Sequence, residues 1–62
     1  MNWFKERYRK ASDIKPGDTL ITTWDEWRVR KVTQYDSGLV TVECTGYSFN
    51  AGRDEQYKVR RN

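Results

Sequence analysis

The turn at residues 15–18, which reads KPGD, constrains the fold of this chain more than any other feature. Proline at the second turn position fixes φ, and glycine at the third supplies the positive φ of a type II turn. Any helix in the preceding residues must therefore end before this turn. The chain after it is rich in β-branched and aromatic residues interrupted by turn residues, a pattern typical of short strands. Five strands are predicted, at residues 19–24, 27–35, 39–45, 47–49 and 56–61.

The third of these segments shows a clear two-residue period. Val40, Val42 and Cys44 alternate with polar residues that include Thr41 and Glu43. Because successive side chains of a strand point to opposite faces, this alternation indicates a half-buried strand. We expect the two valines and the cysteine in the core, and the threonine and the glutamate outside it.

The second segment changes its apolar side partway along. Trp27 and Val29 share one face of the predicted strand, whereas Val32 lies on the other. One extra residue in the strand restores a common face, which is what a β-bulge does. The sequence therefore predicts a bulge near Arg30 and Lys31.

The start of the chain has a helical pattern. Phe4, Tyr8 and Ala11 fall on one stripe, and Asn2 is a candidate N-cap. A short α-helix over residues 3–11 is predicted, and its length requires it to dock on the rest of the protein. The expected architecture is a mainly β single domain over residues 1–62, with a helical segment at 1–13 and a five-stranded small barrel at 14–62.

Size and composition limit how such a domain is stabilised. The chain has 62 residues, 15% of them aromatic, so the rings must supply much of the buried area. Its single cysteine rules out an internal disulfide and favours a reducing cytoplasm. No apolar run is long enough to span a membrane, and no secretory h-region is visible. We therefore expect that the protein does not associate with a membrane.

The residues needed for most enzyme chemistry are missing. Without histidine, the chain lacks Ser-His and Cys-His pairs and the commonest metal ligand. Cys44 is expected to be a small core residue, with a reactive thiol as the alternative. The adjacent acidic pairs at 25–26 and 54–55 are expected to be solvated loop charge. No catalytic residue, metal site or cofactor is predicted.

Two tryptophans, Trp24 and Trp27, flank the acidic pair at 25–26. If that pair is the centre of a hairpin, the two rings face each other and close one end of the fold. Asp-Glu is a poor pair for a tight hairpin turn, so a wider loop with one ring turned outward is the alternative. An outward ring would be a stacking platform for a base or an extended peptide.

Basic residues cluster on two of the predicted strands, and the formal net charge is +3. Joined on one face, they would form a patch able to contact several phosphates, and the neighbouring rings would stack on bases. Nucleic-acid binding through this patch is the first functional hypothesis; the alternative is a solvated surface of mixed charge. The predicted contacts are Arg28, Arg30, Lys31, Lys58, Arg60, Trp24 and Trp27.

A second hypothesis is a protein-interaction module or small inhibitor with an aromatic groove. Its anchors would be Trp3, Trp24, Trp27 and Tyr47, with arginines at the rim. The small size is in keeping with an accessory protein of a phage or mobile element that binds a larger host protein. The two hypotheses differ in salt response, because phosphate contacts weaken steeply with salt. A homodimer formed by edge-strand pairing is a third possibility.

The stretch at residues 14–24, IKPGDTLITTW, resembles the entry into the first strand of SH3-like small barrels, including the KOW and Tudor-like types. The five predicted strands ending in YKVRR extend the resemblance over most of the chain. KOW-type barrels have a glycine in the turn after the first strand, where this chain has Asp25 and Glu26. The resemblance implies a barrel fold and a binding role and does not identify a ligand.

Overall fold

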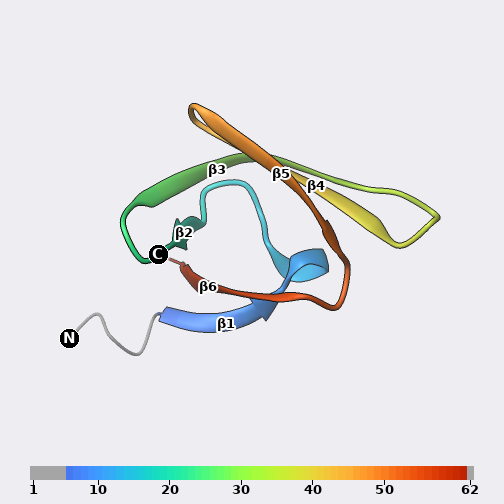
Figure 1. Ribbon diagram of the computed structural model, residues 1–62, viewed down its shortest axis with the longest axis horizontal. Helices are drawn as coiled ribbons and strands as arrows, with labels where there is room; N and C mark the ends of the chain where they lie inside the picture. The colour runs from blue at the N-terminus through green and yellow to red at the C-terminus, as the bar shows by residue number, and fades with distance from the viewer. Residues whose placement is uncertain (1–5, 62) are drawn as a thin grey trace.

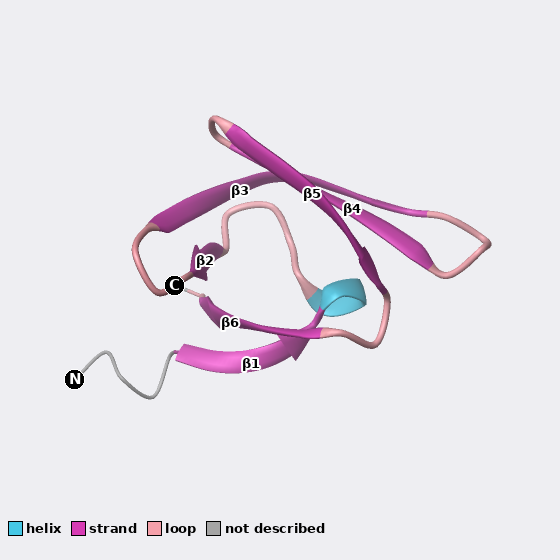
Figure 2. Ribbon diagram, viewed as in Figure 1, coloured by secondary structure: helices cyan, strands magenta, loops and turns pink. Residues whose placement is uncertain are grey.

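The computed structural model describes residues 6–61, which form a mainly β protein, as predicted (Figures 1 and 2). Six strands make one antiparallel sheet in the order β1-β6-β2-β3-β4-β5. A short 3₁₀ turn, η2 (Ala11–Asp13), follows the first strand. The strands are β1 (Glu6–Lys10), β2 (Thr19–Ile21), β3 (Glu26–Gln34), β4 (Leu39–Cys44), β5 (Tyr47–Gly52) and β6 (Gln56–Arg60).

The sheet is strongly curled, and its hydrogen-bonded ladder is open. Figure 1 shows β3, β4 and β5 on one side of the molecule and β1 and β6 on the other, with β2 between them. β1 and β5 are the two edges of the sheet, so strand pairing does not close it into a barrel. The residues buried inside the curl are Ala11, Ile14, Leu20, Val29, Val40, Val42, Cys44, Ala51 and Val59.

The prediction of an amino-terminal helix is wrong over its described part. Glu6–Lys10 form strand β1, which pairs with β6 from Glu6 opposite Arg60 to Lys10 opposite Gln56. Residues 3–5 of the predicted helix lie outside the described residues. An isolated helix of this length is marginal, whereas a ladder with β6 satisfies the same backbone groups and adds tertiary packing. The sheet therefore has six strands instead of five.

The turn at residues 15–18 has the predicted geometry. Gly17 has φ 95°, and the Asp18 N–H donates to the Lys15 carbonyl at 3.1 Å. The Asp18 carboxylate in turn accepts the Lys15 N–H at 2.9 Å. The Gly17 N–H donates to the Val29 carbonyl at 2.9 Å, which ties the turn to β3.

Asp18 and Arg61 form an ion pair in which the carboxylate is buried and the guanidinium is partly exposed. Asp18 is 2% exposed, and both of its carboxylate oxygens accept hydrogen bonds from the Arg61 guanidinium at 2.8 Å. Arg61 also donates to the Asp13 carbonyl at 2.9 Å. Burial acts to raise the pKa of Asp18, but the bonds from Arg61 and the Lys15 N–H outweigh it and lower the pKa. Asp13, Asp18 and Arg61 are called the ionic cluster below.

The alternation predicted for β4 is confirmed. Val40, Val42 and Cys44 are buried at 1%, 0% and 7% exposure, whereas Thr41 and Glu43 are not buried. Burial raises the pKa of the Cys44 thiol, which disfavours the reactive thiolate. Cys44 is thus a core residue.

The predicted bulge in β3 is also present. Val29 pairs with Cys44, but the next paired residue of β3 is Lys31, opposite Glu43. Arg30 is the extra residue, and the shift returns Val32 to the core side opposite Val42. The bulge bends β3 between the part that pairs with β2 and most of the part that pairs with β4. Within residues 6–61, no helix has the length and apolar character needed to cross a membrane.

Candidate binding surface

The loop between β2 and β3 separates the two tryptophans. It covers four residues, because Ile21 is the last residue of β2 and pairs with Glu26. The Thr22 N–H donates to the Asp25 carbonyl at 2.8 Å, and the Asp25 N–H donates to the Thr22 hydroxyl at 3.0 Å. Trp24 lies in the middle of this loop and is 89% exposed. The acidic pair is therefore not the centre of a tight hairpin.

Trp27 has the opposite environment. It lies on β3 opposite Leu20, is partly buried, and packs against the core. Its ring centroid is 5.2 Å from that of Tyr47. The interpretation that Trp24 and Trp27 face each other and jointly close the fold is wrong, since Trp24 is exposed; the alternative of a wider loop with one outward ring matches the structure.

Four rings from three strands make a continuous contact series, called the aromatic row below. Tyr47 lies 5.7 Å from Phe49 between centroids, and Phe49 lies 5.2 Å from Tyr57. Tyr47 and Phe49 share a face of β5 because they are two residues apart, and the curl of the sheet brings Tyr57 of β6 against them. Trp27 completes the series. The row is only partly buried, and Tyr47 is 46% exposed.

Two adjoining hollows lie beside the row. The smaller, of about 110 Å³, lies between β2 and β5 and is lined by Leu20, Ile21, Thr22, Tyr47, Phe49 and Tyr57. The larger, of about 480 Å³, lies where β2 and β6 diverge and also involves Tyr8 and Lys58. Both are lined by Ile21, Thr22 and Tyr57, so the two hollows adjoin each other. The aromatic row, Tyr8 and these shared residues are called the aromatic groove.

Hydrogen bonds fix the Tyr57 end of the row. The Tyr57 hydroxyl donates to the Glu55 carboxylate at 2.9 Å. Burial raises the pKa of Tyr57, and the bond to Glu55 adds to this shift. Glu55 also accepts the Gly52 N–H at 3.0 Å, and these two bonds lower the pKa of its carboxyl. The ring of Tyr57 is thereby held at one wall of the groove.

Two of the predicted phosphate contacts are engaged with carboxylates. Arg60 forms ion pairs with Glu6, at 3.2 Å, and with Glu26. Lys58 lies 3.6 Å from the Glu6 carboxylate. The pKa of Arg60 is raised, chiefly by its hydrogen bond to Glu26. The charge of both basic residues is thus compensated within the chain.

The predicted contacts on β3 remain open to solvent. Arg28, Arg30 and Lys31 are exposed, and none forms an ion pair with another described residue. Arg28 and Arg60 both lie opposite Thr19, so they share the outer face of the sheet. Trp27 is next to Arg28 in β3 and therefore points to the inner face. The structure separates the aromatic row from these cations instead of joining them in one patch.

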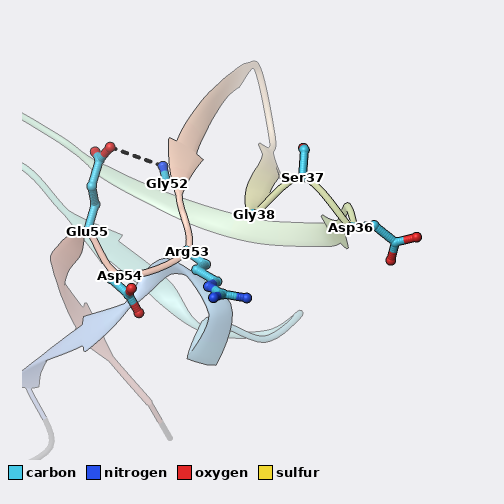
Figure 3. Close-up of a pocket in the computed structure, with 7 residues that line it drawn as sticks. All are labelled: Asp36, Ser37, Gly38, Gly52, Arg53, Asp54 and Glu55. Atoms are coloured by element: carbon cyan, nitrogen blue, oxygen red, sulfur yellow. Dashed lines mark hydrogen bonds between the residues drawn. The ribbon is translucent and has the colours of Figure 1, made fainter.

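A polar hollow of about 490 Å³ lies between the β3–β4 turn and the β5–β6 turn (Figure 3). Its lining includes the carboxylates of Asp36, Asp54 and Glu55 together with Arg53. Figure 3 shows the three carboxylates pointing in different directions. Among the described residues, no three His, Cys, Asp or Glu side chains are grouped to hold a metal ion. The charged groups of this hollow therefore do not converge on one point where they could bind a ligand together.

The sequence hypothesis of an aromatic groove named some of these residues and missed others. Tyr47 and Trp27 are in the row, and Trp3 lies outside the described part of the chain. Phe49, Tyr57 and Tyr8 were not singled out, although Tyr47 and Phe49 already shared a face in the predicted strand. The chain matches no protein-family model, no curated protein and no solved structure.

Proposed function

We propose that this chain is a non-catalytic binding module that holds an extended peptide segment of a protein partner in the aromatic groove. The observation that carries the proposal is the aromatic row: four rings in mutual contact from three strands, and yet only partly buried. A domain of 62 residues needs its aromatic area for its own core. Rings left half exposed in one place provide a contact surface.

The chemistry of the groove favours a peptide. Aromatic side chains are enriched at protein interfaces because they bury large areas at low entropic cost. Tyr8 is 70% exposed and Tyr47 is 46% exposed, so an exposed ring lines each of the two hollows. Lys58, the basic residue lining it, is paired with Glu6. An extended segment with apolar side chains fits this surface better than a polyanion.

We infer that the module is a small SH3-like barrel extended by strand β1. Its open side is bridged by side chains, because Phe49 of β5 packs on Tyr57 of β6 at a centroid distance of 5.2 Å. At the other end, the Ala11 N–H donates to the Glu55 carbonyl at 2.8 Å and the Ser12 N–H donates to the Arg53 carbonyl at 3.2 Å. These contacts support a barrel whose seam is packed and only partly hydrogen-bonded.

Selection of binders from a random peptide library tests the proposal. Peptides selected on the wild-type protein should lose at least about tenfold in affinity for Tyr47→Ser, because interface aromatics are typical hot spots. Tyr35→Ser is the matched control, since Tyr35 is 51% exposed and lies outside the groove. Binding should respond weakly to salt. Selected peptides that bind both variants equally would contradict the groove as the site.

Nucleic-acid binding is a second candidate, supported by a separate observation. Trp24 is 89% exposed, and Arg28, Arg30 and Lys31 on the following strand are exposed and not ion-paired within residues 6–61. An exposed ring near cations is the arrangement that stacks a base and contacts phosphates.

Titration with random-sequence oligonucleotides, single- and double-stranded, at two salt concentrations tests this candidate. Quenching of tryptophan fluorescence that weakens steeply with salt and is lost in Trp24→Ser supports it. Absence of binding at low salt would contradict this candidate and would show that Arg28, Arg30 and Lys31 are part of a solvated surface. Trp24, Arg28, Arg30 and Lys31 do not line the aromatic groove, so loss of oligonucleotide binding in Trp24→Ser is judged separately from peptide binding.

A further inference from the structure

The two edges of the sheet differ in how they are protected. β1 reads ERYRK and carries charge at four of its five positions, whereas β5 reads YSFNAG and carries none. Edge strands of soluble proteins are usually guarded by charge, proline, bulges or a covering segment, because their free backbone groups accept another strand. The β5 edge lacks the first two of these safeguards.

The hydrogen-bond pattern identifies which groups of β5 face outward. In an antiparallel pair, alternate residues exchange hydrogen bonds with the neighbouring strand. The Arg53 N–H donates to the Gly38 carbonyl at 2.9 Å, which places the odd-numbered residues of β5 toward β4. The N–H and C=O groups of Ser48 and Asn50 therefore point away from β4. Both residues are exposed.

The free part of the edge is short and has a defined end. The Gly52 N–H donates to the Glu55 carboxylate at 3.0 Å, and the Glu55 N–H donates to the Gly52 carbonyl at 3.0 Å. Gly52 is thereby closed to a further strand. The backbone of Ser48 and Asn50 forms no hydrogen bond outside the ladder with β4 among the described residues.

We propose that this edge pairs with the same edge of a second copy, giving an antiparallel homodimer with its two-fold axis at Phe49. In this register Ser48 lies opposite the partner's Asn50, and Asn50 lies opposite the partner's Ser48. Each of these pairs exchanges two hydrogen bonds, so every outward group of the free edge is satisfied. The register is self-complementary, as a two-fold interface requires.

Charge favours this pairing over self-pairing of the other edge. β5 has no charged residue, so the two copies bring no like charges together. An antiparallel pair of β1 strands centred on Tyr8 would place Arg7 opposite the partner's Arg9, which is unfavourable. The same register would place Glu6 opposite the partner's Lys10, but Glu6 is already paired with Lys58 and Arg60 within its own chain. The charge distribution thus directs the second copy to β5.

Side-chain packing supports the same register. Phe49 would face the partner's Phe49 on the inner side of the sheet, at a position where antiparallel side chains approach most closely. Tyr47, which is 46% exposed, would face the partner's Ala51. The dimer goes beyond the proposed function and depends on the backbone edge. Because Tyr47 and Phe49 also line the aromatic groove, a second copy and a bound peptide would contact the same rings, and sedimentation of the chain without peptide tests the dimer by itself.

Sedimentation equilibrium of the full chain over a range from micromolar to millimolar concentration tests the dimer. The wild-type mass should rise with concentration from 7.5 kDa toward twice that value. Ser48→Lys should raise the dissociation constant at least about tenfold, because it puts lysine on the edge in each copy. In the monomer the new lysine faces Glu43 of β4, so folding should be retained. Ser37→Lys, the same change in the β3–β4 turn, is the matched control.

Amide hydrogen exchange at low and high protein concentration checks the register. The N–H groups of Ser48 and Asn50 should exchange more slowly at high concentration in the wild type and in Ser37→Lys, but not in Ser48→Lys. A monomer at millimolar concentration overturns the proposal. A dimer that Ser48→Lys leaves unchanged, or one without protection at these two amides, overturns it as well.

Discussion

The ionic cluster and the aromatic row occupy two ends of the inner surface of β6, but they differ in exposure. Arg61 follows the strand and bonds to Asp18, which is 2% exposed, whereas Tyr57 near its start packs in a row that is partly open. The ionic cluster has both carboxylate oxygens of Asp18 bonded, so it has little capacity for a ligand. The aromatic row keeps exposed ring faces.

The difference shows how a very small domain combines stability and binding. A buried ion pair is geometrically demanding and is strongly destabilising when one partner is removed. Truncation of a partly buried ring costs less than truncation of a fully buried one, since part of its area is already exposed to water. We therefore expect the ionic cluster to determine the fold and the aromatic row to determine binding. The following substitutions test that division.

Asp18→Asn should have the largest effect on stability. The asparagine amide carries no charge to neutralise Arg61, and it has only one oxygen that can accept a hydrogen bond. The free energy of unfolding should therefore fall by about 2 to 4 kcal/mol. Urea denaturation followed by circular dichroism measures the change. Asp54→Asn is the matched control, because Asp54 is 75% exposed and lies 3.7 Å from Lys10; its effect should be below about 0.5 kcal/mol. Equal effects for the two variants would contradict the division.

Phe49→Ala should be the next most damaging change. It removes the ring that joins Tyr47 to Tyr57, and a partly buried phenylalanine of this kind should cost about 2 kcal/mol in the same denaturation experiment. Tyr35→Ala, at a ring that is 51% exposed, is the control and should change little. A loss larger than that of Asp18→Asn would make the aromatic row the principal support of the fold.

Acid should weaken the ionic cluster and leave the aromatic row unaffected. The pKa of Asp18 is lowered in the folded protein, so its contribution to stability is complete above its ordinary value of about 3.9 and is lost as pH falls through the lower folded value. The hydrogen bond from Arg9 lowers the pKa of Asp13, which acts in the same direction. Urea midpoints measured from pH 6 downward should fall less steeply in Asp18→Asn than in Phe49→Ala. Parallel slopes would assign the acid sensitivity to other groups.

Trp24→Ala should have the smallest effect, within about 0.5 kcal/mol, because its ring is 89% exposed and outside the aromatic row. Trp27→Ala is the comparison, since that ring packs on Tyr47 and on the core. Thermal unfolding of both variants measures the difference. A Trp24→Ala protein that unfolds as readily as Trp27→Ala would show that the exposed ring has a structural role.

The sequence predicted the local parts of this fold because their causes are local. The turn at Gly17 depends on the conformation of adjacent residues, and the bulge at Arg30 follows from a change of apolar face within one strand. The burial of Val40 and Val42 follows from a two-residue period. In each case the information lies within a few residues of the feature that it determines.

The errors concern features that depend on distant residues. β1 was predicted as a helix because Phe4, Tyr8 and Ala11 have helical spacing, and only its partner β6 makes it a strand. The Asp18–Arg61 bond joins residues 43 apart in the chain, and no local pattern indicates it. The aromatic row likewise requires the curl that brings β6 against β5. Its rings were visible in the sequence, but their convergence was not.

The pairing of β1 with β6 also bears on how the protein folds during synthesis. β6 is the only neighbour of β1 in the described sheet, and the bond between Arg60 and Glu6 spans 54 positions. While the ribosome is still making the middle strands, β1 has no strand to pair with, and Asp18 has no Arg61. Such distant contacts slow folding, because the chain must close long loops before they form. The ladders β3–β4 and β4–β5 join strands that are adjacent in the sequence, and we expect them to form first.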